Sequence, residues 1–146
     1  MRILKRAAAL AAVAALALPA SAPGAEYRGK TAQGLKVSAR VTDGRLKLLK
    51  ITWRVPCDHA GPWKDRTYWE DRPEGPIEHD GTRFTDGGVQ ERKFTDGRVT
   101  YNLKLSGEIA DKRITGKMTV KMKLYSTDGE HVNNCRGTIR FNIPRV

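Results

Sequence analysis

Long hydrophobic runs are scarce in this sequence, which has one uninterrupted apolar stretch, from Ala7 to Leu18. The stretch has 12 residues, whereas a helix that spans a bilayer needs roughly 20. No cysteine follows it closely and no Arg-Arg pair precedes it. These absences exclude a lipid-modified N-terminal cysteine and argue against a twin-arginine signal. The sequence therefore predicts no transmembrane segment in the mature chain.

The flanks of this apolar stretch are those of a Sec-type secretory signal. Three basic residues and no acid precede it, and a proline with several small residues follows it, as in signal peptides. We expect residues 1–25 to be the signal peptide, with cleavage after Ala22 or Ala25. Residues 26–146 should then form one soluble β domain, either periplasmic or extracellular.

Cysteine is almost absent, because the chain has only Cys57 and Cys135. A domain of about 120 residues buries enough apolar surface to fold without many disulfides. Export places both cysteines in an oxidising compartment, so we expect a disulfide between them. The bond would close a loop of 79 residues, worth about 4.5 kcal/mol in the chain-entropy model.

Acidic residues are outnumbered by basic ones. Without the predicted signal, 24 Lys and Arg stand against 16 Asp and Glu, a net charge near +8. A surface of this sign favours anionic partners such as acidic polysaccharide, anionic lipid or nucleic acid. The same charge is also consistent with solubility alone.

Familiar catalytic signatures are missing as well. The sequence has no Gly-x-Ser-x-Gly elbow, no His-Glu-x-x-His and no phosphate-binding glycine loop. A Cys–His nucleophile is disfavoured because both cysteines are expected to be oxidised. We expect a non-catalytic protein without a cofactor, and an enzyme that uses Glu70, Asp71 or Glu78 is the weaker alternative.

The sequence shows no helical periodicity beyond the signal. Its most regular local feature is a repeated turn sequence. Asp-Gly occurs in four similar tripeptides, at residues 42–44, 85–87, 95–97 and 127–129. Glycine supplies the positive φ of a tight hairpin turn, and aspartate tolerates it. We therefore expect a hairpin turn at each of these positions.

The clearest hairpin is expected at residues 98–125, where apolar and polar residues alternate on both sides of a turn at 111–112. Such alternation is typical of half-buried strands. Folding about the turn pairs Ile109 with Ile114, Leu105 with Met118, and Tyr101 with Met122. It also pairs Gly107 with Gly116, which predicts a bend or a close backbone approach.

Two further strand regions have informative patterns. The apolar phase of residues 45–55 shifts near Leu48 and Leu49, which predicts a β-bulge there. The last strand alternates from Cys135 to Ile143 and ends at Pro144. The expected strands are 26–31, 35–42, 45–55, 66–70, 89–95, 98–109, 113–125 and 135–143.

About eight strands with short connections predict an all-β fold, a single antiparallel meander. It could be a small closed barrel or a flattened β-sandwich. In outline the barrel resembles lipocalin-type and avidin-type barrels, although their signature motifs are not present. The chain also resembles small secreted bacterial β proteins, and neither resemblance implies a function.

The alternation stops between residues 57 and 82, where we expect a long irregular loop. This loop has a net charge near −4, and the residues of interest in it are His59, Trp63, Tyr68, Trp69 and His79. The aromatic side chains could cap one end of a barrel, or they could line a pocket for a sugar ring or an apolar ligand. The histidines with nearby carboxylates could hold a metal, but their spacing matches no metal motif, so we expect none.

A basic face is expected on the outer side of the 98–125 hairpin, formed by Lys104, Lys117, Lys121 and Lys123. It could be extended by Lys47, Lys50, Arg136 and Arg140. Such a face could track a polyanion, or it could simply be a solvated surface that discourages edge aggregation. Few aromatic residues interleave with the lysines, which argues against nucleic acid as the partner.

Two functions follow from these features. The favoured one is a non-catalytic exported protein that binds a small apolar or sugar-like ligand at the loop-covered end of a barrel. The alternative is a secreted surface-interaction protein whose basic face binds cell-envelope polyanions or an acidic protein.

Overall fold

The computed structural model describes residues 24–146, in which nine strands and no helix occur. The strands are β1 (Ala25–Lys30), β2 (Lys36–Thr42), β3 (Arg45–Val55), β4 (Trp63–Glu70), β5 (Glu78–Asp80), β6 (Arg83–Phe94), β7 (Gly97–Ile109), β8 (Arg113–Ser126) and β9 (His131–Pro144). The predicted signal peptide lies outside the described residues except for Gly24 and Ala25. Within the described part, no helix could cross a membrane.

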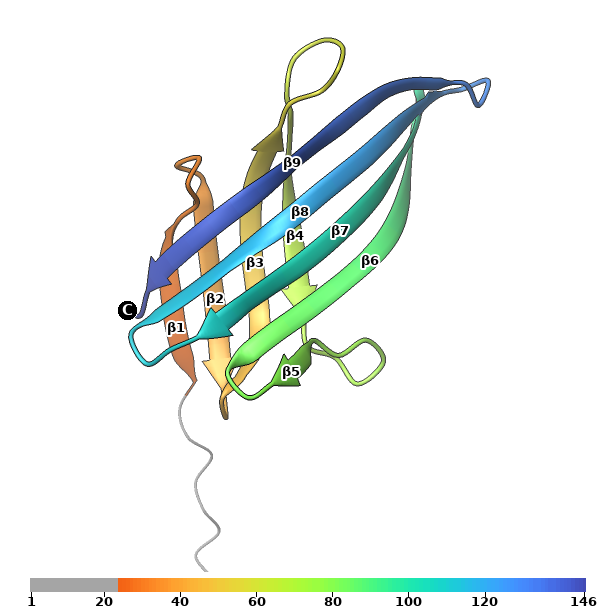
Figure 1. The fold of residues 1–146 in the computed structure, drawn as a ribbon. Coiled ribbons are helices and arrows are strands. Elements are labelled where there is room, and N and C mark those ends of the chain that lie inside the picture. Colours follow the sequence, from red (N-terminus) through yellow and green to blue (C-terminus); the bar gives the residue numbers. More distant parts are fainter. Residues whose placement is uncertain (1–23) are drawn as a thin grey trace, which may run out of the picture.

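The strands form two antiparallel sheets, ordered β1-β2-β3-β4 and β5-β6-β7-β8-β9 (Figure 1). Every ladder joins strands that are consecutive in the sequence, so the expected all-β meander is confirmed. One apolar core lies between the sheets, and Trp53, Phe84 and Met118 are among its fully buried side chains. Within a strand such as β7, buried residues alternate with outward ones, as a sheet with one buried face requires.

The expected closed barrel is wrong, and the flattened two-sheet alternative describes the molecule. On one side, isolated bridges join Tyr27 to Arg145 and Thr31 to Phe141, so β1 and β9 lie edge to edge. On the other side, β4 and β6 are not joined by a ladder within residues 24–146. The sandwich is therefore linked along one side and open along the other.

Three of the four expected Asp-Gly hairpin turns are confirmed, between β2 and β3, β6 and β7, and β8 and β9. Gly44 and Gly129 have φ of 72° and 83°, values that glycine adopts without strain. The turn expected at residues 85–87 is wrong, because β6 runs straight through them. The chain turns instead at Asp80-Gly81, a further Asp-Gly pair, where Gly81 has φ 60°.

The β7–β8 hairpin has the expected register. Ile109 opposes Ile114, Leu105 opposes Met118, and Tyr101 opposes Met122. Gly107 opposes Gly116. The ring of Phe84 fills the space where a side chain on Gly107 would lie, and the ring of Phe141 does the same at Gly116. The close approach predicted at this glycine pair is therefore confirmed, and it is made by aromatic rings of the core.

The expected bulge in β3 is confirmed one residue earlier than the sequence indicated. Val41 opposes Leu46 while its neighbour Arg40 opposes Leu48, so Lys47 is the extra residue. The bulge moves Leu49 and the alternate residues after it onto the buried side of the sheet.

The disulfide expected between Cys57 and Cys135 is present, with the two Cα atoms 4.0 Å apart. Backbone hydrogen bonds flank it, from Asp58 N to Asn134 O and from Arg136 N to Pro56 O. The bond therefore ties the chain that leaves β3 to β9, which belongs to the other sheet.

Candidate functional site

The segment expected to be an irregular loop, residues 57–82, contains strands β4 and β5. The sequence indicated only part of β4, residues 66–70, because two of the inward side chains of this strand, Asp65 and Thr67, are polar. Both make hydrogen bonds inside the sandwich: Trp53 Nε1 donates to Thr67 Oγ1 at 2.9 Å, and Tyr101 Oη donates to Asp65 Oδ2 at 3.2 Å. These partners let polar residues occupy positions that face the core.

The three aromatic residues expected to bind a ligand lie on both sides of β4. Trp69 belongs to the core with 7% of its surface exposed, and its Nε1 points at Met118 Sδ, 3.4 Å away. Trp63 is half-buried and packs edge-to-face on Phe94, with ring centroids 6.0 Å apart. Tyr68 points outward and is 50% exposed. Tyr68 is therefore the member of the trio that a ligand could reach.

Tyr68 borders a hollow of about 370 Å³ on the outer side of the four-stranded sheet. Each strand of that sheet contributes one cation to the rim: Arg28 from β1, Lys36 from β2, Lys50 from β3 and Arg66 from β4. We call these four cations and Tyr68 the cationic hollow. An anionic group that enters it would approach four positive charges and one aromatic ring.

Two of the cations also contact the tyrosine. Arg66 Nη1 donates a hydrogen bond to Tyr68 Oη at 3.3 Å, and Lys50 Nζ lies 5.8 Å from the centre of the ring. The hydrogen bond from Arg66 is the main reason that the pKa of Tyr68 is lowered, with the charges of Arg66 and Lys50 adding to it. The phenol is therefore held in an electropositive environment and accepts, rather than donates, its hydrogen bond from Arg66.

The cationic hollow is part of a larger basic surface on the outward positions of β1 to β4, which we call the four-strand face. Its eight exposed cations are Arg28, Lys30, Lys36, Arg40, Lys50, Arg54, Lys64 and Arg66. Two carboxylates, Glu26 and Glu70, lie in the same cross-strand row at one end of it. Glu26 binds Arg28 at 2.6 Å, and Glu70 pairs with Arg72. The rest of the face is positive.

The chain matches no known protein family, no curated protein and no solved structure. The site must therefore be interpreted from its own geometry and chemistry.

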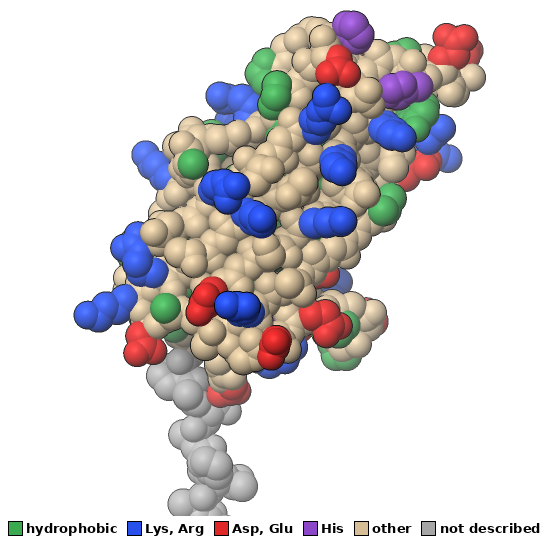
Figure 2. Space-filling view, viewed as in Figure 1, with side chains coloured by type: hydrophobic (Ala, Val, Ile, Leu, Met, Phe, Trp, Pro, Cys, Tyr) green, Lys and Arg blue, Asp and Glu red, His purple; other side chains and the backbone are tan. Residues whose placement is uncertain are grey.

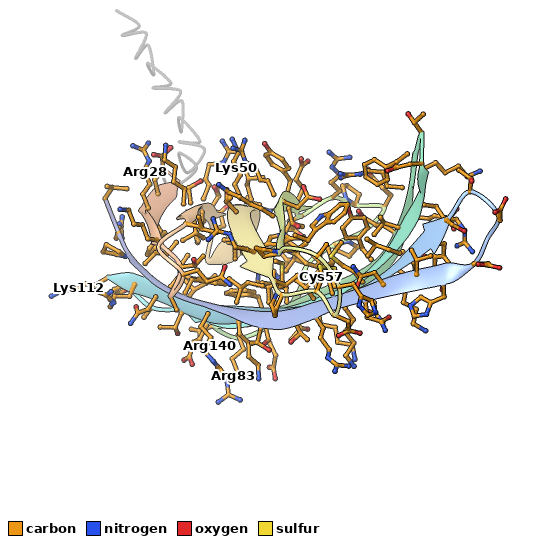
Figure 3. All side chains as sticks on the ribbon, turned by 90° about the horizontal axis from the view of Figure 1, so that it is seen from above. Arg28, Lys50, Cys57, Arg83, Lys112 and Arg140 are labelled. Atoms are coloured by element: carbon orange, nitrogen blue, oxygen red, sulfur yellow. A yellow bond between two sulfur atoms is a disulfide. The ribbon has the colours of Figure 1, made fainter. Side chains whose placement is uncertain are left out.

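The basic face expected on the 98–125 hairpin forms the outer side of the five-stranded sheet, and we call it the five-strand face. Lys104, Lys117, Lys121, Lys123, Arg136 and Arg140 are all exposed on it, and Figure 2 shows Lys and Arg side chains spread across this side. Lys50, which was expected to extend this face, lies on the opposite side of the molecule from Arg140 (Figure 3). Lys47, also expected there, binds Asp71 at 3.3 Å.

Both outer faces contain cations directly opposite each other on adjacent strands. On the four-strand face the pairs are Lys30 with Lys36 and Arg54 with Lys64. On the five-strand face they are Lys117 with Arg140 and Lys121 with Arg136. Like charges at directly opposite positions destabilise a sheet. An anion bound over these pairs would remove that repulsion.

The cationic hollow was not predicted from the sequence, although the spacing of its basic residues indicates it. Exposed basic residues are two positions apart in β1 and β4 and four positions apart in β2 and β3. That spacing puts them on one side of each strand. The predicted basic face covered the 98–125 hairpin and left out the first four strands.

The two histidines expected at a ligand or metal site lie in different places. His59 is exposed in the β3–β4 connection, where its backbone N donates to Asn133 Oδ1 at 3.0 Å. His79 is half-buried in β5, and its Nε2 accepts a hydrogen bond from Leu46 N at 3.0 Å. Across residues 24–146, no group of three His, Cys, Asp or Glu side chains is placed to hold a metal ion.

Asp71 organises the chain that follows β4. Its carboxylate accepts hydrogen bonds from Arg45 Nε at 3.1 Å, Lys47 Nζ at 3.3 Å and Ile77 N at 3.0 Å. Only 6% of the side chain is exposed. The hydrogen bonds from Arg45 are the main reason that the pKa of Asp71 is lowered to about 2. Asp71 is therefore ionised near neutral pH, and its role is structural, because its carboxylate holds the chain after β4 in place.

Asp65 joins the open edges of the two sheets. Asp65 accepts a hydrogen bond from Tyr101 Oη and forms an ion pair with Arg92 Nη1 at 3.4 Å. Burial, followed by the charge of Asp65, raises the pKa of Tyr101 to about 12. Asp65, Arg92 and Tyr101 line a smaller hollow of about 190 Å³ between β4 and β6.

Proposed function

We propose that this protein is an exported, non-catalytic binding protein for anionic glycopolymers of the cell envelope. The observation that carries the proposal is the cationic hollow, which four cations from four strands line together with an exposed tyrosine. Arginine presents a planar fork that binds carboxylates and phosphates through two hydrogen bonds. Arg28 and Arg66 supply such forks, while Lys36 and Lys50 supply point charges between them.

A sugar polymer fits this site better than a nucleic acid does. The planar face of Tyr68 could stack on a sugar ring while the cations bind its charged substituents. Proteins that bind single strands of nucleic acid usually offer several aromatic rings in succession. Among the outward residues of β1 to β4, Tyr68 is the one aromatic side chain.

A small apolar or sugar-like ligand held by Trp63, Tyr68 and Trp69 together has less support. Trp69 is packed in the core and Trp63 is packed against Phe94, so neither ring offers a free face beside Tyr68. The sugar-binding part of that hypothesis is retained here through Tyr68 alone.

Export is supported by two independent features. The N-terminal residues have the charge and apolar pattern of a secretory signal. The Cys57–Cys135 disulfide is typical of oxidising compartments outside the cytoplasm. Both agree with a partner in the cell envelope or outside the cell.

The proposal is tested by titrating the oxidised, mature protein with tetragalacturonate, a short chain of carboxylated sugars, while recording backbone amide NMR spectra. The expected result is that amides of the hollow, such as those of Gly29 and Thr52, shift in a saturable way. The shifts should weaken as salt rises, because salt screens the charges of an exposed site. An equivalent titration with single-stranded DNA is the comparison, and tighter binding of DNA would favour a nucleic-acid partner.

Two variants separate the hollow from general charge. Lys50→Gln removes a cation of the hollow and should weaken binding several-fold. Lys104→Gln removes one cation from the opposite side of the molecule and should leave the shifts at the hollow unchanged. Absence of saturable shifts at the hollow in the wild-type protein, at low salt, would overturn the proposal.

A further inference from the structure

The two basic faces point in opposite directions. Figure 3 shows Arg28 and Lys50 on one side of the sandwich and Arg83 and Arg140 on the other. The four-strand face has eight exposed cations. The five-stranded sheet has ten outward cations, among them Lys117, Lys121 and Arg140, and four outward carboxylates, which are Glu78, Asp80, Glu91 and Glu108. Each side is therefore positive by itself.

The two faces are far enough apart to act separately. Stacked sheets lie about 10 Å apart, so outward side chains on both sides place the charges roughly 20 Å from each other. Interactions between exposed charges are screened beyond about 8 Å at physiological ionic strength. A polyanion on one face therefore does not neutralise the other face.

The cross-strand pairs of like charge also occur on both sides. Lys30 opposes Lys36 on the four-strand face, and Lys117 opposes Arg140 on the five-strand face. Such pairs cost stability without contributing to the core, and their presence on both faces points to a use for both.

We propose that one molecule binds two anionic polymer chains at once, one on each outer face, and so cross-links them. This inference rests on the proposed function, since it takes the same anionic glycopolymer as the partner of each face. It adds that the protein is bivalent as a monomer, and that its activity is to join chains rather than only to bind them.

The experiment mixes the oxidised, mature protein with long-chain polygalacturonate at low salt and measures light scattering, with binding followed in parallel by anisotropy of a fluorescent, short polygalacturonate. One triple variant neutralises the four-strand face: Arg28→Gln, Lys50→Gln and Arg66→Gln. Another neutralises the five-strand face: Lys117→Gln, Lys121→Gln and Arg140→Gln. A matched control removes three cations from the ends and edge of the sandwich: Arg72→Gln, Lys112→Gln and Arg145→Gln.

The expected result is that the wild-type protein and the control variant cross-link the polymer and produce strong scattering. Each single-face variant should still bind the short chain but lose most of the scattering, because one binding face remains. Thermal unfolding of each variant checks that it is folded, and sedimentation without polymer checks that each is a monomer.

Three outcomes would overturn the inference. The wild-type protein could bind the short chain without scattering, which would leave the proposed function standing and remove bivalence. Both single-face variants could scatter like the wild type, which would show that opposite faces are not required. A dimer in the absence of polymer would assign bivalence to self-association. Failure of the wild-type protein to bind any polygalacturonate would overturn the proposed function itself.

Discussion

Lys117 of β8 and Arg140 of β9 are directly opposite each other, and both point away from the core. Directly opposed like charges destabilise an antiparallel pair, by roughly 0.2–1 kcal/mol. Replacing Lys117 with Thr, a good strand former, should therefore raise the free energy of unfolding by about that amount. Urea denaturation at low salt measures it, and the gain should shrink at high salt because the repulsion is screened.

The matched control is Lys104→Thr, which makes the same change on the same face. Lys104 opposes Gly87 on one side and Thr119 on the other, so this substitution gains strand propensity without relieving a charge pair. Its stabilisation should be smaller and less dependent on salt. Equal gains for the two variants at every salt concentration would show that the charge pair costs nothing.

Asp71 should make the stability of the protein depend on acidic pH. Its pKa is lowered to about 2 from an ordinary value of 3.8. The folded state therefore gains from the ionised carboxylate above pH 4, and this gain is lost as the pH falls through about 2. Arg45 and Lys47 are partly exposed, which reduces the effect, so Asp71→Asn should cost on the order of 1 to 2 kcal/mol at neutral pH.

Denaturation of the wild-type protein and of Asp71→Asn at several pH values checks this. The difference between them should be largest at neutral pH and should shrink towards pH 2. Asp111→Asn, in the exposed β7–β8 turn, is the control and should show little difference at any pH. A cost for Asp71→Asn that stays constant down to pH 2 would mean that the charge of Asp71 contributes nothing.

The tyrosines should ionise over a wide pH range. The chain has four of them, and the pKa of Tyr68 is lowered while that of Tyr101 is raised to about 12. In an alkaline titration followed by phenolate absorbance, Tyr68→Phe should remove a transition at lower pH than the one that Tyr101→Phe removes. Reversal of that order would contradict the environments assigned to the two side chains.

Tyr101 should also set a limit on stability at high pH. An unfolded tyrosine ionises near pH 10, whereas Tyr101 in the folded protein stays protonated until about pH 12. The stability that comes from its neutral form is therefore complete below pH 10 and is lost as the pH rises to 12. The free energy of unfolding of Tyr101→Phe should fall less steeply over that interval.

The sequence predicted the register of the β7–β8 hairpin correctly because its alternation is unbroken and its turn is short. A period of two leaves only one register that buries every apolar side chain, and the turn fixes it. The bulge in β3 was visible for the same reason, since Lys47 interrupts an otherwise regular pattern.

The strands at the open side of the sandwich were harder to recognise. In β4 the inward positions include Asp65, which is satisfied by Tyr101 and Arg92 from other strands. In β6 only the first inward residue, Phe84, is buried, because the strand borders the open side. The apolar alternation of β4 is interrupted because its polar residue has partners distant in the sequence. That of β6 is interrupted because no strand covers its inward side.

The cationic hollow depends on the same kind of information. Arg28 and Arg66 are 38 positions apart and come together because β1 to β4 are arranged in sequence order in one sheet. The basic residues were visible in the sequence, but their grouping needed the order of the strands. The sequence did not decide between a closed barrel and a sandwich. That choice depends on whether β4 and β6 pair, and they do not form a ladder.

The glycine pair in the β7–β8 hairpin should tolerate no side chain. A Cβ on Gly116 would collide with the ring of Phe141 and with the Ser106 carbonyl oxygen. The oxygen belongs to the backbone of the neighbouring strand and cannot move alone, so Gly116→Ala should distort the ladder. Overpacking of this kind typically costs about 1 to 3 kcal/mol, which urea denaturation would measure.

The control for this prediction is Gly88→Ala in β6, where a Cβ would meet no atom within 4 Å. Alanine is less flexible than glycine in the unfolded chain, so this substitution should be neutral or mildly stabilising. Because both glycines lie in strands of the same sheet, a difference between the two variants measures the cost of the collisions with Phe141 and with the Ser106 carbonyl oxygen. If Gly116→Ala were as stable as Gly88→Ala, both the ring of Phe141 and the backbone at Ser106 would have to shift freely. The core over this glycine pair would then be looser than the complete burial of Ile114 and Met118 indicates.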